Sequence, residues 1–423
     1  MTFSLKNYRL HESRVFRDPI HGYIRIYDLP CWQLINTKEM QRLRRIHQLG
    51  GTHQVYQTAE HSRFTHSLGV YEVVRRMLAL ETFDGLVNDY DRLTVLAAAL
   101  LHDIGHGPFS HSFENVFHHH HELYTRSIIL DEKTEVNAVL RAIDPHLPED
   151  VADIISKEHR NPLLVQMVSS QIDGDRMDYL LRDSYFSGTA YGRFDLERIL
   201  RTMRVHDGRI VFKESGIQAV ENYILARYHM YWQVYYHPVT RAYEQLLVMI
   251  FSRLRYLFNH QFAFNCDLKF LIPFLKNEDV AVEAYLKLDE SVLIYYFSCL
   301  EDCQDEILSD LCQRFLNRRL FKHRNLKDDQ ELASIREIVR KKGYDPDYYV
   351  TCDDASTTPY IHYGAGDEVQ EIQILMAESN EVRTLPEVSE IVKAIVDTKM
   401  HKSDRKVYFP KEVKLDLQKT KTR

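Results

Sequence analysis

The sequence predicts a mainly α-helical fold, a helical bundle with a short N-terminal β-hairpin and a mixed α/β C-terminal region. First, the run RLTVLAAALLHDI at residues 92–104 is almost wholly apolar, which is typical of a helix buried at the centre of a bundle. Second, residues 15–28 (VFRDPIHGYIRIYD) alternate around Ile24 and Ile26 between turn signals, which indicates a hairpin. Third, strand candidates mix with helical patterns only beyond about residue 255.

Helical patterns dominate the chain after the hairpin. Thr37 is placed to cap a helix that runs through Leu49 and ends at the glycines that follow. Further helices are expected at the following residues: 65–80, 92–104, 175–183 and 219–236. Helical patterns then continue to about Lys342.

The C-terminal part has a different character. A loop-like stretch at 345–359 precedes a strand candidate at 371–376, a helix at 387–397, a strand at 407–409 and a lysine-rich tail. No linker marks a boundary. From the change of character near residue 255, we divide the chain into a core at 1–255 and a C-terminal region at 256–423. We expect that region to pack on the core or at subunit interfaces.

Composition narrows the class of protein. The 423 residues carry a formal net charge of −7, which argues against a protein whose main partner is duplex nucleic acid. No stretch resembles a signal peptide and no apolar run is long enough for a membrane span, so we expect a cytoplasmic protein without a membrane partner. The six cysteines are scattered and lack metal-ligand spacing.

Histidines crowd between His47 and His121, often beside acids and glycines. Within this stretch His66 begins a helical pattern, and His102 with Asp103 ends the buried helix; Asp175 opens a later helix. Two imidazoles and two carboxylates form a mixed nitrogen and oxygen shell that suits a divalent ion with open positions. The sequence does not separate magnesium, manganese, iron and zinc.

A lone histidine–aspartate pair is more often a cap or a polar core pair than a metal site. Here Asp103 follows a run of aliphatic residues, and burying an unpaired carboxylate there would cost several kcal/mol. A metal or another cation is the simplest remedy, so the pattern favours a metal site.

Five ordered strings connect these residues to a known family. They are DPIHG, QRLRRIHQLGG, RFTHSLGV, HDIGHGPFSH and DRMDYLLRD, and they span roughly residues 15–183. In this order they resemble the HD-domain superfamily, in its deoxynucleoside triphosphate triphosphohydrolase branch of bacterial, dGTPase-like type. The resemblance implies an HD-domain helical bundle and a metal held by His66, His102, Asp103 and Asp175. Residues beyond about 255 carry no string that matches.

The family implies that histidines or a histidine–carboxylate pair beside the metal assist attack on the α-phosphorus. By position, the candidates are His106, His111, Glu114 and His121. Such groups can orient water and supply a proton to the leaving group. Ordinary polar loop residues are the alternative.

A triphosphate needs cations, and arginine binds phosphate through a planar fork. Arg63, Arg176 and Arg227 are the candidates. Asp175, Tyr179 and Asp183 recur every fourth residue and so share one helix face.

The resemblance implies that Tyr179 lies by the sugar and excludes a 2′-hydroxyl, and that Asp183 and Gln48 bind the 3′-hydroxyl. It places Tyr235 by the base or the sugar. Alternatively, the two tyrosines are core aromatics and Gln48 is a helix terminus.

Members of this branch commonly form homotetramers with activating nucleotides between subunits. The matching positions for such a regulatory nucleotide are Arg14, Val15, Asn36 and Arg44. The pattern has an acid at position 36 to read guanine, and an amide cannot accept two donors as a carboxylate does. Guanine-nucleotide activation is therefore not expected, although a homotetramer is.

We therefore predict metal-dependent hydrolysis of a deoxynucleoside triphosphate to the deoxynucleoside and tripolyphosphate. One alternative keeps the metal but acts as a phosphodiesterase or nucleotide phosphatase. A third class is a nucleotide-sensing protein whose catalysis is vestigial. The reaction products distinguish the three.

Overall fold

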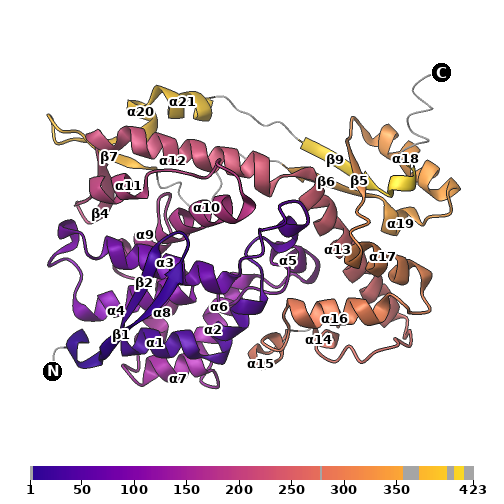
Figure 1. Cartoon of the computed structure of the whole chain (residues 1–423), viewed down its shortest axis with the longest axis horizontal. Helices are drawn as coiled ribbons and strands as arrows, with labels where there is room; N and C mark the ends of the chain where they lie inside the picture. Colours follow the sequence, from indigo (N-terminus) through magenta and orange to yellow (C-terminus); the bar gives the residue numbers. More distant parts are fainter. Residues whose placement is uncertain (1–2, 277–278, 356–370, 398–403, 414–423) are drawn as a thin grey trace.

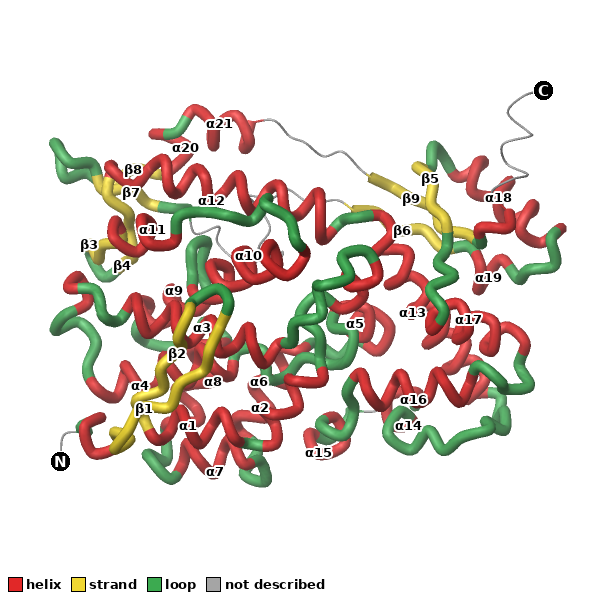
Figure 2. The backbone as a smooth tube through the Cα atoms, in the orientation of Figure 1, coloured by secondary structure: helices red, strands yellow, loops and turns green. Residues whose placement is uncertain are grey.

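The computed structural model describes residues 3–276, 279–355, 371–397 and 404–413. Helices make up most of it, and strands form three small groups (Figure 2). None of the described helices combines the length and the apolar character that crossing a membrane requires.

The hairpin and the first helices come before the metal ligands. Strands β1 (Arg9–Asp18) and β2 (Gly22–Asp28) pair antiparallel, with a register shift between Arg9 and Arg14. Two short helices follow, α1 (Leu29–Asn36) and α2 (Lys38–Arg42).

Thr37 caps α2 as expected, because its side chain accepts a hydrogen bond from the Met40 amide. The expected helix through Leu49 is wrong, however: α2 ends at Arg42 and a 3₁₀ turn, Leu43–Arg45, follows. The physical reason is tertiary, since Arg42, Arg45 and His47 bond to residues 288–290 far along the chain.

Helix α4 lies at the centre of the first of two cores, the one formed mainly by residues before α13. It is almost entirely buried and packs against α1, α3, α8 and α9. The helices of this part are α3 (Arg63–Met77), α4 (Asp89–Leu101), α5 (His111–Phe117), α6 (His121–Leu130), α7 (Glu135–Arg141), α8 (Leu147–Ile155), α9 (Pro162–Val168), α10 (Gly174–Ser187), α11 (Leu196–Thr202) and α12 (Ile217–Met230). A π-helical turn, Tyr231–Tyr235, extends α12, so the expected helical stretch at 219–236 is confirmed.

The second half of the chain begins with the long helix α13. Its helices are α13 (Pro238–Asn259), α14 (Ile272–Leu275), α15 (Val282–Tyr285), α16 (Glu290–Leu300), α17 (Glu306–Leu316), α18 (Asp329–Lys341), α19 (Pro346–Tyr349), α20 (Leu385–Val388) and α21 (Glu390–Asp397). Its strands are β5 (Lys322–Asn325), β6 (Thr351–Ala355) and β9 (Asp404–Phe409), in the order β5-β9-β6.

Two expectations need correction here. The helical pattern to Lys342 is interrupted by β5, and the stretch expected as a loop contains α19 and β6. Both strands pair with β9, a partner that local sequence does not reveal. Residues 356–359 of that stretch and the lysine-rich tail from 414 lie outside the described residues.

Part of the C-terminal chain returns to the first core. Strands β3 (Met203–His206), β4 (Arg209–Lys213), β7 (Gln373–Leu375) and β8 (Val382–Thr384) form one sheet, with β7 parallel to β4. Helices α20 and α21 then lie over α12 (Figure 1).

Buried apolar residues form two clusters. One extends through the chain to Val234 and includes residues from β7, α20 and α21; the other contains most residues from Ala242 onward. Helix α5 belongs to the second cluster, although its neighbours in sequence belong to the first. The division at residue 255 stays a prediction; the change of core falls before it, at the start of α13.

Candidate active site

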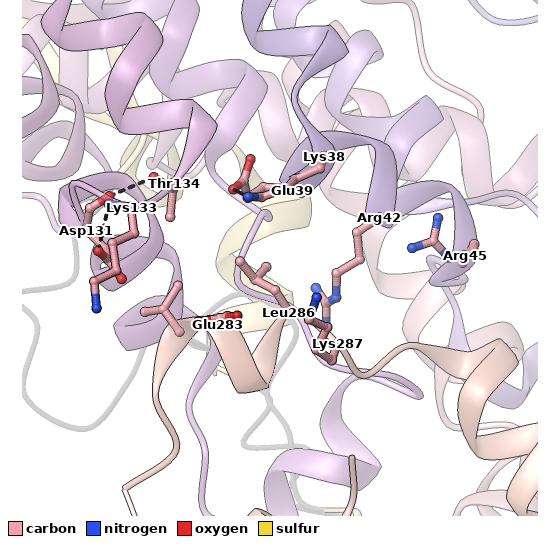
Figure 3. Close-up of a pocket in the computed structure, with 11 residues that line it drawn as sticks. Lys38, Glu39, Arg42, Arg45, Asp131, Lys133, Thr134, Glu283, Leu286 and Lys287 are labelled. Atoms are coloured by element: carbon pink, nitrogen blue, oxygen red, sulfur yellow. Dashed lines mark hydrogen bonds and ion pairs between the residues drawn. The ribbon is translucent and has the colours of Figure 1, made fainter. Parts of the chain in front are cut away.

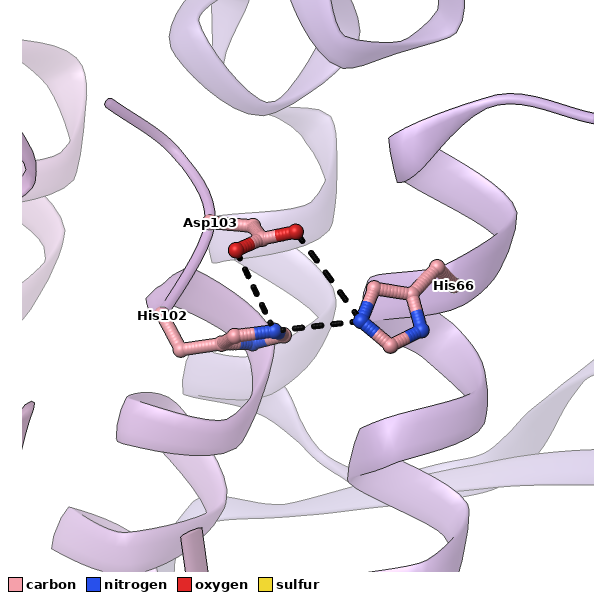
Figure 4. A group of neighbouring side chains, drawn as sticks. All are labelled: His66, His102 and Asp103. Carbon is pink, nitrogen blue, oxygen red and sulfur yellow. Dashed lines mark hydrogen bonds and ion pairs between the residues drawn. The ribbon is translucent and has the colours of Figure 1, made fainter. Parts of the chain in front are cut away.

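The four predicted metal ligands converge from three helices. His66 lies in the first turn of α3, His102 and Asp103 follow α4, and Asp175 lies in the first turn of α10. The Nε2 atoms of His66 and His102 are 3.3 Å apart, and Asp175 Oδ1 is 3.0 Å from His66 Nε2. Asp103 Oδ1 is 3.5 Å from His102 Nε2 (Figure 4).

The outer nitrogens of both rings are already bonded. His66 Nδ1 is 2.8 Å from Asp178 Oδ2, and His102 Nδ1 is 2.9 Å from the Ala99 carbonyl oxygen. Donation from each Nδ1–H leaves both Nε2 lone pairs facing the same point, together with carboxylate oxygens. This donor set fits a divalent ion.

The electrostatics also favour a cation at this point. Burial disfavours the imidazolium form of His66, but hydrogen bonds to Asp175 and Asp178 outweigh it and raise its pKa to about 10. Burial likewise opposes a charge on His102, and the carboxylates of Asp103 and Asp175 raise its pKa. The site therefore stabilises positive charge.

A buried network that sequence reasoning missed holds His66 in place. The Asp178 carboxylate accepts hydrogen bonds from Nε and Nη2 of Arg182, both at 2.8 Å. Its Oδ1 also lies 2.7 Å from His21 Nε2. Arg182 also donates to Asp18 Oδ2 at 2.7 Å. Asp178 lies three residues after Asp175, so helical periodicity together with the DPIHG string could have found this network.

Gly69 makes the network possible. A Cβ atom at this position of α3 would collide with the Asp178 carboxylate and with Arg182 Nη2. The glycine of RFTHSLGV therefore permits α3 and α10 to approach closely.

Three of the four predicted catalytic residues form a second group beside Asp103. His121 Nδ1 is 2.8 Å from Glu114 Oε1, and the His106 and His121 rings stack with centroids 3.8 Å apart. His106 Nε2 is 3.3 Å from Asp103 Oδ1, which joins the two groups. The fourth residue, His111, begins α5, but its side chain lies outside the described part of the structure.

Burial has the largest effect on the pKa of His106 and lowers it well below the ordinary value. The charges of Arg63 and His121 lower it further, and together these effects outweigh Asp103, which raises it. His106 is therefore a neutral imidazole at physiological pH.

Arg63, predicted to bind phosphate, contacts the metal ligands directly. Its Nη1 donates to Asp103 Oδ2 at 2.5 Å, and its Nη2 donates to Ser110 Oγ at 2.8 Å. The guanidinium is therefore held against a predicted metal ligand.

The residues predicted to bind the sugar are brought together. Tyr235 donates to Asp183 Oδ2 at 2.8 Å, and the Tyr179 and Tyr235 rings are 6.3 Å apart. The other oxygen of Asp183 is 2.7 Å from His61 Nε2, a residue that sequence reasoning missed. Asp183 is therefore fixed from two sides.

The remaining predicted substrate residues are Arg176, Arg227 and Gln48. Burial raises the pKa of the Tyr179 hydroxyl, and the positive charges of Arg227 and Arg176 oppose this effect, which places both near the ring. Arg176 pairs with Asp173, and Arg227 donates to Gln171. Gln48 Oε1 is buried and has no hydrogen-bond partner among the described residues. It can therefore accept a hydrogen bond from a hydroxyl group of a ligand.

The predicted regulatory residues contact aromatic residues or are exposed. Arg14 lies over the ring of Trp32, and the Asn36 amide donates to the Trp32 carbonyl at 2.7 Å. Val15 is exposed on β1. Arg44 stacks on Phe64, with its guanidinium carbon 3.6 Å from the ring centroid.

Comparisons with known proteins agree with this geometry. The HD domain family matches residues 63–183, and the HD associated region matches residues 194–262. The uncharacterized protein YwfO of Bacillus subtilis is 48% identical over 417 residues, which cover 97% of this chain and 95% of that protein. Deoxynucleoside triphosphate triphosphohydrolase SAMHD1 of Danio rerio is 31% identical over 282 residues, which cover 57% of this chain and 45% of that protein.

A solved structure extends the likeness to nearly the whole fold. The crystal structure of a phosphohydrolase from Bacteroides thetaiotaomicron has a TM-score of 0.78 and 26% identity, and the match covers 94% of this chain and 99% of that chain. The predicted family and the predicted mainly helical fold are thus confirmed. The chain belongs to the HD domain phosphohydrolase family and carries that family's HD associated region after its HD domain.

Proposed function

We propose that the chain hydrolyses deoxynucleoside triphosphates to the deoxynucleoside and inorganic tripolyphosphate. The observation that carries the proposal is the contact between the two groups. The metal-ligand group and the His106–Glu114–His121 group meet at Asp103, with Arg63 against the same carboxylate. The similarity to a deoxynucleoside triphosphate triphosphohydrolase supports it.

In this reaction a water oxygen bonds to the α-phosphorus, the bond from that phosphorus to O5′ breaks, and O5′ takes a proton. A divalent ion held by His66, His102, Asp103 and Asp175 would neutralise phosphate charge and lower the pKa of water. Arg63 adds positive charge at the same place.

The His121–Glu114 pair is suited to serve the leaving O5′. A hydrogen bond from His121 Nδ1 to Glu114 orients the ring and leaves Nε2 for the proton transfer. Neutral His106 stacks on that ring, and its own Nε2 lies 3.3 Å from Asp103 Oδ1. His106 therefore positions the His121 ring beside the metal ligands. In this role His121 is the proton donor and Glu114 its orienting partner.

The sugar and base would lie along α10 and the end of α12. The Tyr179 ring restricts space for a 2′-hydroxyl, while Asp183 and the unpartnered Gln48 Oε1 are available to a 3′-hydroxyl. Tyr235 would contact the base or the sugar. Arg176 and Arg227, whose charges act on the Tyr179 hydroxyl, are the further candidates to bind phosphate.

Product analysis tests the proposal. The protein is incubated with each of the four deoxynucleoside triphosphates, singly and mixed, with magnesium or manganese. Deoxynucleoside and tripolyphosphate are the expected products. Monophosphate and pyrophosphate, or no product, contradict the proposal and favour a phosphodiesterase or a nucleotide sensor.

A matched pair of variants isolates the metal centre. His102→Ala is expected to abolish turnover and metal binding but to leave the fold intact. His146→Ala, which removes an exposed histidine, is expected to behave as wild type. Full turnover in His102→Ala would remove the metal from the mechanism.

We also propose a cytoplasmic homotetramer with a nucleotide bound near Arg14, Val15, Asn36 and Arg44. The convergence of Arg14 and Asn36 on Trp32 supports a binding surface there. Light scattering after size-exclusion chromatography measures the assembly. A monomer at working concentrations would contradict it, and turnover that needs a nucleotide mixture would indicate an activator.

A further inference from the structure

The turn that follows α4 carries much of the chemistry of the site. Residues 102–106 include two predicted metal ligands, His102 and Asp103, and His106 of the second group. Between α4 and α5 the chain runs through turns and loop, and the His106 amide donates to the Asp103 carbonyl at 3.1 Å. A turn is less rigid than a helix, so the geometry of these side chains depends on what other elements hold the turn in place.

Helix α6 holds the turn from one side. The Gly105 amide donates to Thr125 Oγ1 at 3.0 Å, and the Thr125 hydroxyl donates to the His102 carbonyl at 3.2 Å. A Cβ atom at Gly105 would lie 2.2 Å from the Thr125 nitrogen, so only glycine lets the turn approach α6 this closely. The two bonds fix the start and the middle of the turn.

Tyr285, the last residue of α15, holds the turn from the C-terminal region. Its hydroxyl donates to the Gly105 carbonyl at 2.6 Å, and the residue is 1% exposed. The ring stacks on Tyr124, with centroids 3.7 Å apart, and a Cβ atom at Gly107 would lie 3.2 Å from the hydroxyl oxygen. Burial raises the pKa of Tyr285, so the hydroxyl keeps its proton at neutral pH and remains a donor.

Arg42 connects the next carbonyl of the turn to the same region. Its Nη1 donates to the His106 carbonyl at 2.9 Å, and its Nε and Nη2 donate to the Leu288 carbonyl at 3.0 and 2.8 Å. Figure 3 shows Arg42 beside Leu286, the residue that follows Tyr285, where both line a cavity of about 520 Å³. The C-terminal region therefore reaches two successive carbonyls of the turn, one directly and one through Arg42.

We propose that Tyr285 is a positioning residue for the reaction, because its hydroxyl fixes the peptide between Asp103 and His106. His106 Nε2 lies 3.3 Å from Asp103 Oδ1 and its ring stacks on His121, so a shift of the Gly105 peptide changes how these groups face one another. The effect on turnover rests on the proposed function, whereas the effect on the turn does not.

Two tyrosine variants of the full chain separate positioning from a general loss of stability. Tyr285→Phe removes the hydroxyl and keeps the ring that stacks on Tyr124. The matched control is Tyr296→Phe, in the same core. Tyr296 is 2% exposed, and its hydroxyl accepts a hydrogen bond from the Phe270 amide at 3.3 Å. Circular dichroism on heating identifies a temperature at which both variants are folded.

Hydrogen–deuterium exchange at that temperature, without metal or nucleotide, measures the turn itself. Loss of one hydrogen bond increases local opening by about five- to tenfold. Peptides that cover residues 102–109 are therefore expected to exchange faster by about that factor in Tyr285→Phe and at the wild-type rate in Tyr296→Phe. Wild-type exchange in Tyr285→Phe, or the same increase in the control, overturns the proposal.

Turnover of deoxynucleoside triphosphates is measured with the same three proteins. A displacement of about 1 Å can cost about a hundredfold in rate, so we expect kcat of Tyr285→Phe to fall by about ten- to a hundredfold. KM should stay within about twofold of wild type, since no predicted substrate residue is altered. A wild-type kcat in Tyr285→Phe, or an equal loss in Tyr296→Phe, overturns the positioning role. A wild-type protein without turnover contradicts the proposed function, and the exchange rates then decide whether Tyr285 fixes the turn.

Discussion

Replacing Asp178 by asparagine removes one negative charge from the fully buried network behind His66. Each carboxylate oxygen faces one nitrogen of Arg182 and one histidine nitrogen. Whichever way the new amide turns, its NH₂ group meets an N–H of Arg182. Breaking a buried pair costs about 3–5 kcal/mol; because Arg182 keeps Asp18, we expect the lower end, about 3 kcal/mol.

The same change should weaken the metal centre. A neutral amide oxygen polarises the His66 ring less than a carboxylate does, which makes Nε2 a weaker donor to a metal. If the amide NH₂ faces Nδ1 instead, the tautomer is reversed and Nε2 carries the proton. Loss of such a partner typically costs 10–100-fold in metal affinity, and we expect a loss of about that size. Guanidinium denaturation with chelator present measures stability, and calorimetric titration with Mn²⁺ measures affinity.

The control is Asp207→Asn, which removes an exposed carboxylate. It should leave stability and metal affinity as in wild type. A folded Asp178→Asn protein with unchanged Mn²⁺ affinity would refute the argument that this network orients His66.

Three further predictions concern the supports of the site. Gly69→Ala is expected to destabilise the fold by about 1–3 kcal/mol, because its methyl group meets Asp178; a variant as stable as wild type in denaturant would contradict this. Glu290→Ala leaves the amides of His47 and Phe109 without their acceptor, at about 1–3 kcal/mol for each buried donor, and should reduce turnover; unchanged kcat and stability would argue against this contact. The hydrogen bond to Glu290 raises the pKa of His47, so the pair stabilises the fold below the ordinary imidazole pKa of about 6.5 and loses this contribution as pH rises through the raised value. The stability difference between wild type and His47→Gln should therefore shrink from acid to alkaline pH, and a constant difference would exclude the ionised pair.

The sequence predicted the parts of the site that local patterns determine. The apolar run before His102 requires a buried helix, and a helix end inside a core needs a partner for Asp103; both features are present. The hairpin was predicted from its turn residues, although β1 begins earlier, at Arg9. His66 was found because its string places it at a helix start.

Other features depend on residues that are distant in the chain. The expected helix beyond Arg42 fails because Arg42 and His47 bond to Leu288 and Glu290, which no pattern near residue 42 reveals. Strand β5 was missed for the same reason, since its partner is β9. The closed arrangement around Asp183 likewise needs His61, which local spacing does not connect to it.

The position of α5 has a consequence for how this chemistry can change over time. Phe113 packs against Phe251 and Phe274 of the second core, while the metal ligands are fixed in the first. Glu114 therefore contacts His106 and His121 at the boundary between the two clusters of buried apolar residues. Substitutions in the core of the C-terminal region can therefore alter the distance between Glu114 and the two histidines without replacing any of these residues. Variants with identical motifs and identical metal ligands can then differ in catalytic rate.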